Sequence, residues 1–129
     1  MHRLLAWLVA LALVPSTLAC STSPKRQLQG KWVGERVEHF SPAQATRAAG
    51  WVIGTSFEFE GSRVSIAIPA ETPREGTFEV MKVTEGTLSL AFLRSDGVRE
   101  TADFRIEDDG HLRWQLGDGR SVLLRKSTN

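Results

Sequence analysis

The sequence has few cysteines and little net charge, two features that mark common classes of protein. It contains a single cysteine, Cys20, which excludes an intramolecular disulfide and a zinc site built from several cysteines. Its 16 lysines and arginines are balanced by 15 aspartates and glutamates, which excludes a polyanion-binding arm and an acidic disordered tail. Its 129 residues have room for one domain. The composition therefore predicts one small domain with no built-in attraction to nucleic acid.

Long apolar runs are also scarce. The longest, residues 4–14, holds eleven residues, whereas a membrane-spanning helix needs about 20. It follows the basic residue Arg3 and leads, through Pro15, to the small residue Ala19. This order is typical of a secretory signal peptide. We therefore predict that residues 1–19 are a signal peptide and that the protein is exported.

The end of this signal resembles a known processing site. Residues 17–20, Thr-Leu-Ala-Cys, are similar to the lipobox of bacterial lipoproteins, in which the cysteine becomes the acylated N-terminus of the mature chain. The resemblance implies a lipid anchor on Cys20, with palmitate as a typical acyl chain. Because Ser21 follows rather than aspartate, it also implies sorting to the outer membrane. A secreted protein without lipid is the alternative. Residues 20–29 are polar and aperiodic, so we expect a lipidated cysteine and a flexible tether leading to a domain at residues 30–126.

From Gly30 onward, apolar residues recur with a period of two, which indicates strands with one face in a core. Pairs that favour tight hairpins separate these segments, namely Gly61-Ser62, Asp96-Gly97, Asp109-Gly110 and Asp118-Gly119. The pattern predicts an all-β fold, an eight-stranded antiparallel up-and-down barrel. The residues predicted to face its core are Phe57, Phe59, Val64, Ile66, Ile68, Phe78, Val80, Leu88, Leu90, Phe92, Ala102, Phe104, Ile106, Leu112, Trp114, Leu116, Val122 and Leu124.

One segment breaks this period. Ser41 is a good N-cap residue, Pro42 suits the first helical position and Gln44 the capping-box position. Gly50 suits the left-handed residue that often ends a helix. We therefore predict a short helix at residues 42–49, between the first and second strands, that covers one end of the barrel.

The two ends of the barrel sequence resemble a known family. Gly30-Lys31-Trp32 opens the first strand and Leu123-Leu124-Arg125 closes the last, a pairing similar to that of the lipocalin-like (calycin) proteins. The resemblance implies that Trp32 plugs the barrel floor and that Arg125 packs across its indole. A guanidinium over an indole is a cation–π contact worth about 0.5–2 kcal/mol. Gly30, Trp32 and Arg125 are thus the expected barrel-closing residues.

The large aromatic residues are the candidate lining of an interior ligand site. Most are in phase with the core, and Trp51 follows the predicted helix at the mouth. The same side chains are bulky enough to fill a small barrel. The candidate lining residues are Trp51, Phe57, Phe59, Phe92, Phe104 and Trp114.

No catalytic residue, metal site or cofactor is predicted. Glu38 and His39 are neighbours on a strand and point to opposite faces, and Ser41 is explained as a helix cap. His111 follows two aspartates, but no second histidine or cysteine stands at a ligand spacing. No glycine-rich phosphate loop precedes a helix.

These observations predict a membrane-anchored, lipocalin-like lipoprotein that binds a small apolar ligand without catalysis. The alternative is a solid barrel that binds or inhibits another protein through its loops. Residues 69–74, stiffened by Pro69 and Pro73, are the loop where such a partner is expected.

Overall fold

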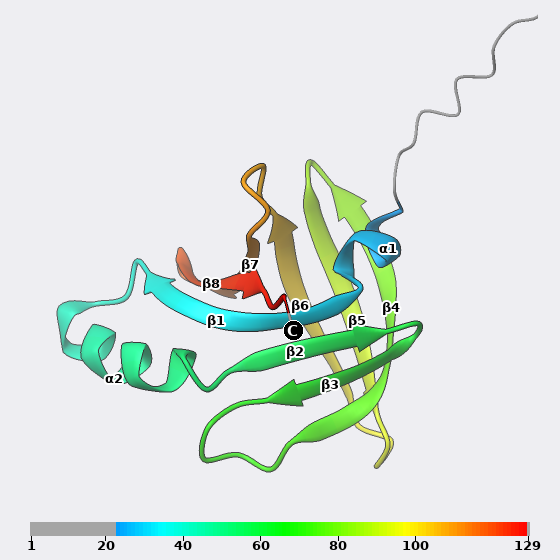
Figure 1. The fold of residues 1–129 in the computed structure, drawn as a ribbon, viewed down its shortest axis with the longest axis horizontal. Coiled ribbons are helices and arrows are strands. Elements are labelled where there is room, and N and C mark those ends of the chain that lie inside the picture. Colours follow the sequence, from blue (N-terminus) through cyan, green and yellow to red (C-terminus); the bar gives the residue numbers. More distant parts are fainter. Residues whose placement is uncertain (1–22, 129) are drawn as a thin grey trace, which may run out of the picture.

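The computed structural model describes residues 23–128, which form a closed barrel of eight antiparallel strands (Figure 1). The predicted up-and-down barrel with one short helix between its first two strands is confirmed. The signal peptide at residues 1–19 and the lipidation site Cys20 lie outside the described residues. The strands are β1 (Gly30–Glu38), β2 (Ser56–Glu60), β3 (Arg63–Ala67), β4 (Arg74–Thr84), β5 (Thr87–Arg94), β6 (Arg99–Ile106), β7 (Leu112–Gly117) and β8 (Arg120–Lys126).

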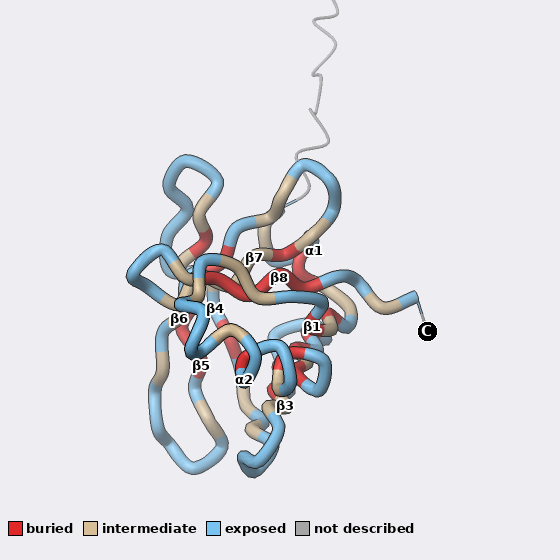
Figure 2. Tube along the Cα trace, turned by 90° about the vertical axis from the view of Figure 1, so that its left-hand side faces the viewer, coloured by how far each residue is buried: buried red, intermediate tan, exposed pale blue. Residues whose placement is uncertain are grey.

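Each strand pairs with the next along the chain, and β8 pairs with β1 to close the ring. Residues that face each other in a pair, such as Phe78 and Phe92, place their side chains on the same side of the sheet. Every residue predicted to face the core lies in the buried cluster or packs against it. Burial is concentrated within the strands, and the hairpins between them are exposed (Figure 2).

The predicted hairpin turns join the strands where the sequence placed them. In the β7–β8 turn, Asp118 and Gly119 both have the positive φ that a tight hairpin requires, at 54° and 75°. A further turn of the same kind, Glu85-Gly86, joins β4 to β5 and was not among the predicted pairs.

The helix between β1 and β2 is α2 (Pro42–Val52), three residues longer than predicted. Its start is as expected, since the Ser41 carbonyl accepts the first hydrogen bonds, although the Ser41 side chain makes no capping bond. The predicted end at Gly50 is wrong, because the helix continues to Val52. The Val52 side chain is buried in the core. Figure 1 shows α2 at the far end of β1, beside the barrel.

A second helix, α1 (Pro24–Leu28), precedes the barrel and corrects the prediction of a flexible tether through residue 29. The Ser23 hydroxyl caps it by accepting from the Arg26 amide. Leu28 is fully buried and belongs to the core cluster. Neither helix of residues 23–128 has the length and apolar character needed to cross a membrane.

Candidate ligand-binding pocket

A pocket of about 390 Å³ opens at one end of the barrel. This end, called the open end below, is where β3, β5 and β7 finish and β4 and β6 begin. The opposite end, where α1 lies, is called the closed end. The pocket is lined by Phe57, Ile66, Ile68, Arg74, Phe92, Glu100, Thr101, Ala102, Trp114, Gln115 and Leu116.

Three of the predicted ligand-lining residues, Phe57, Phe92 and Trp114, contribute to this lining. Their strands present them inward by the period of two, and the Phe57 and Trp114 rings meet edge to face with centroids 5.2 Å apart. Ala102 leaves space beside them because its side chain is a single methyl group. The arrangement gives an apolar hollow above an aromatic floor.

Two other predicted lining residues, Phe59 and Phe104, lie deeper, where the barrel is filled. Phe59 contacts Phe78 with ring centroids 4.9 Å apart, and Phe104 contacts Phe57 at 5.4 Å. Both side chains are 1% exposed or less. The interior is therefore packed toward the closed end and hollow toward the open end.

The sixth predicted residue, Trp51, is on α2. It packs against the core cluster, and its carbonyl oxygen accepts a hydrogen bond from the Thr55 hydroxyl at 3.1 Å. Among the described residues that line the open-end pocket, none belongs to α2. The expectation that this helix covers the mouth is thus not what the structure shows, since the helix docks against β1 instead.

Charged side chains stand at the rim of the pocket. Arg74 is opposite the inward residue Ile66, and Glu100 is opposite the inward residue Phe92, so both charged side chains also point inward. Arg74 Nη1 donates to Glu100 Oε2 at 3.3 Å. The same carboxylate forms an ion pair with Arg94 at 3.5 Å. An apolar hollow thus has an ionic rim on three adjacent strands.

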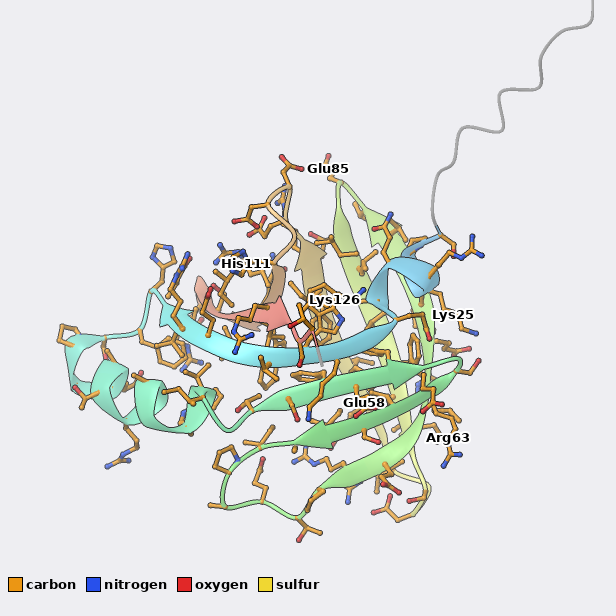
Figure 3. The ribbon with its side chains drawn as sticks, viewed as in Figure 1. Lys25, Glu58, Arg63, Glu85, His111 and Lys126 are labelled. Atoms are coloured by element: carbon orange, nitrogen blue, oxygen red, sulfur yellow. The ribbon has the colours of Figure 1, made fainter. Side chains whose placement is uncertain are left out.

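The closed end is sealed by Trp32, which is 3% exposed and donates from its indole nitrogen to the Leu28 carbonyl at 2.8 Å. The cation over its ring is Lys126, with Nζ 5.4 Å from the ring centroid, and not the predicted Arg125. The reason is register, since Lys126 is opposite Trp32 whereas Arg125 is opposite Val33. Gly30 admits Lys126, because a Cβ there would stand 2.9 Å from its Cε. Figure 3 shows Lys126 above β1.

An ionic network covers the outer face of the β1–β8–β7 region. Arg113 donates to Glu38 at 2.6 Å, to the Ser121 hydroxyl at 2.7 Å and to Glu107. The hydrogen bond from Arg113 holds the pKa of Glu38 below its usual value, although burial acts in the opposite direction. Because each charge has an opposite partner in contact, the network fastens strands together.

His111 lies between two carboxylates. Its Nε2 is 2.7 Å from Glu35 and its Nδ1 is 2.9 Å from Asp109. The contact with the Asp109 carboxylate, and then the hydrogen bond to Glu35, raises the pKa of His111 above its usual value. Within residues 23–128, no group of three or more histidine, cysteine, aspartate or glutamate side chains is arranged to hold a metal ion.

The rim pair was missed by reading the sequence, although a signal for it was present. Counting back by twos from Phe78 reaches Arg74, and counting back from Ala102 reaches Glu100. The apolar alternation does not mark either position, because both side chains are charged. Comparison of the chain with protein-family models, curated proteins and solved structures finds no match.

Proposed function

We propose that this chain is an exported lipoprotein, anchored to the bacterial outer membrane by lipid on Cys20. Its lipocalin-like barrel would be a non-enzymatic binding module for a small apolar ligand. The observation that carries the proposal is the pocket of about 390 Å³ at the open end. Ligand sites of drug size start at about 300 Å³ and are lined mainly by apolar side chains with a few polar groups.

The binding mechanism follows from the lining. A ligand that enters removes apolar surface of Phe57, Phe92 and Trp114 from water, and removing such surface stabilises the complex by about 25 cal/mol per Å². The packed rings beneath them limit how deep the ligand goes. The charged side chains of the pocket, Arg74 and Glu100, are paired with each other, so the Glu100 carboxylate is held in an ion pair at the rim.

The test is binding of the uncharged fluorescent probe N-phenyl-1-naphthylamine to residues 21–129. This fragment contains every strand of the closed barrel. We expect saturable binding of one probe per chain. Ala102→Phe should abolish it, because the added ring occupies the hollow. Ala49→Phe adds the same ring to the exposed side of α2 and should leave binding unchanged.

The alternative, a solid barrel that binds another protein through residues 69–74, is the other outcome. It would be favoured if the parent fragment bound no probe while giving a cooperative unfolding transition. In that case the hollow at the open end would not be a ligand site.

A further inference from the structure

Charge is distributed unevenly between the two ends of the barrel. The closed end holds eight lysines and arginines and five aspartates and glutamates, whereas the rest of residues 23–128 holds seven and ten. With histidine neutral, the closed end thus has a formal charge of +3 and the remainder −3. Two of its five carboxylates, Glu107 and Asp109, are held by Arg113 and His111. The segments counted as the closed end are residues 23–31, 60–63, 82–87, 105–111 and 125–128.

Several cations of the closed end have no carboxylate partner. Lys25 and Arg26 of α1 and Lys82 of β4 are exposed, and among residues 23–128 none of the three forms an ion pair. Lys25 donates instead to the Ser62 hydroxyl at 2.6 Å. Unpaired cations gathered at one end of a neutral domain attract an anionic surface.

An apolar side chain is exposed beside these cations. The pairing of β3 with β4 stops at Thr77, so the end of β4 extends past β3 toward the closed end, where α1 also lies (Figure 1). Met81 and Val83 on this extension are 52% and 54% exposed. Met81 is engaged, since Arg99 Nη2 lies 3.5 Å from its sulfur. Val83 is next to Lys82, close to the turn that joins β4 to β5.

The position of the anchor limits how far α1 stands from a bilayer. Only Ser21 and Thr22 separate Cys20 from Ser23, the residue that caps α1. Three residue steps reach about 10 Å when fully extended. Lipid on Cys20 would thus hold α1 within about 10 Å of the head groups, which is about the Debye length at 0.1 M salt. Over that distance the exposed cations and the lipid phosphates attract each other.

We propose that the closed end docks on the anionic phospholipid bilayer that anchors the chain. Lys25, Arg26 and Lys82 contact lipid phosphates, and Val83 enters the head-group region. Basic residues next to a membrane are attracted to its anionic lipids, and burial of an apolar side chain adds to the attraction. This inference rests on the lipid anchor of the proposed function and does not depend on the pocket.

Docking is measured on the lipidated full chain in vesicles of phosphatidylcholine and phosphatidylglycerol. Cys20 is the only cysteine, so once it carries lipid a cysteine introduced elsewhere is the only free thiol. Val83→Cys is labelled with a nitrobenzoxadiazole dye. The matched control is Ile53→Cys after α2, where the side chain is 75% exposed and α2 lies at the other end of β1. A nitroxide on the lipid should quench the dye on residue 83 at least about twofold more than the dye on residue 53, because a docked side chain reaches the head-group boundary.

Charge variants then assign the attraction to the exposed cations. Arg26→Gln and Lys82→Gln should each lower the ratio of docked to undocked protein by about fivefold, the value expected for one basic residue near an anionic surface. Quenching of the parent should also decrease as salt is added. The control is Arg47→Gln, the same change on an exposed residue of α2, and it should leave quenching unchanged. A cooperative unfolding transition shows that each variant is folded.

Flotation of the vesicles measures anchoring separately from docking. If the chain floats but the dyes on residues 83 and 53 are quenched equally, docking is wrong and the lipid anchor stands. If the chain carries no lipid and does not float, both are wrong. Shielding of residue 83 from aqueous iodide without quenching by the lipid nitroxide would mean that a second copy of the chain covers this surface, which overturns the proposal. Equal quenching in phosphatidylcholine alone would overturn the role of the cations.

Discussion

Gly34 on β1 lies directly against the carbonyl oxygen of Val52 at the end of α2. A Cβ atom on residue 34 would stand 1.9 Å from that oxygen. In the same contact, the Gly34 amide donates to the Thr55 carbonyl at 2.9 Å. Glycine at this position is thus what allows the helix to dock on the barrel.

We predict that Gly34→Ala lowers the free energy of unfolding by about 1–3 kcal/mol, because a backbone group must move to admit the methyl group. The control is Gly50→Ala, inside α2, where a Cβ would have no atom within 4 Å. That change should raise the free energy of unfolding by about 0.5–1 kcal/mol, since alanine suits a helix interior better than glycine. Urea denaturation measures both, and a loss at Gly50 would mean that the helix ends there.

The closed end gives a second prediction. Trp32→Ala should cost about 3–5 kcal/mol as a large core truncation. Lys126→Ala should be non-additive with it, because the two side chains are in contact. Arg125→Ala, one residue away, should be additive with Trp32→Ala within about 0.3–0.5 kcal/mol. Coupling of Trp32 to Arg125 in place of Lys126 would contradict the register of β8.

His111 should make stability depend on pH. Its pKa is raised in the folded state by Asp109 and Glu35, so its contribution is fully present below about pH 6.5, the usual histidine pKa. The contribution is lost as the pH rises through the higher folded-state pKa. The difference in unfolding free energy between the parent and His111→Gln should therefore shrink from about pH 5.5 to about pH 8. A constant difference across that range would show that the histidine does not titrate against the carboxylates.

The depth of the hollow can be mapped with two matched substitutions. Phe59→Trp enlarges a ring in the packed region and should destabilise by about 1–3 kcal/mol through overpacking. Phe92→Trp enlarges a ring that borders the pocket, so the added volume should extend into it. We expect a smaller loss of stability and a loss of probe binding. Thermal unfolding and probe titration of the two variants measure this, and equal destabilisation would mean that the hollow does not reach Phe92.

The anchor is tested on the full chain. Cys20→Ser should abolish incorporation of a radiolabelled fatty acid and move the protein from the membrane fraction to the soluble fraction. The labelled lipid and the pelleting are measured on the same cells. A variant that still carries the label and pellets with membranes would refute the lipoprotein proposal.

The interior of the barrel was predictable from the sequence because a strand places alternate residues on opposite faces. The register across the barrel seam, where β8 pairs with β1, was not predictable from the sequence. β1 and β8 shift register by one residue between Gly34 and Arg36, and beyond this irregularity Trp32 is opposite Lys126. A local pattern carries no information about such a long-range offset.

The ends of the two helices were harder to predict, for a related reason. α1 has five residues, too few to be stable alone. It forms because Leu28 is buried and its carbonyl accepts from the Trp32 indole, contacts that exist only in the folded barrel. In α2, burial of Val52 extends the helix past Gly50, which local propensity had marked as its end. Tertiary contacts decided both boundaries.

The position of α1 gives the barrel a direction. The chain enters at the closed end, where Lys25 bonds Ser62 and Gln29 bonds Gly61, while the pocket opens at the other end. An anchor upstream of α1 would therefore hold the molecule with its mouth turned away from the anchoring bilayer. A ligand would then arrive from the aqueous side, through water or from a carrier, and could not pass straight from the lipid beneath. In that orientation, if the proposed function holds, the barrel would receive molecules crossing the compartment rather than extract them from its own membrane.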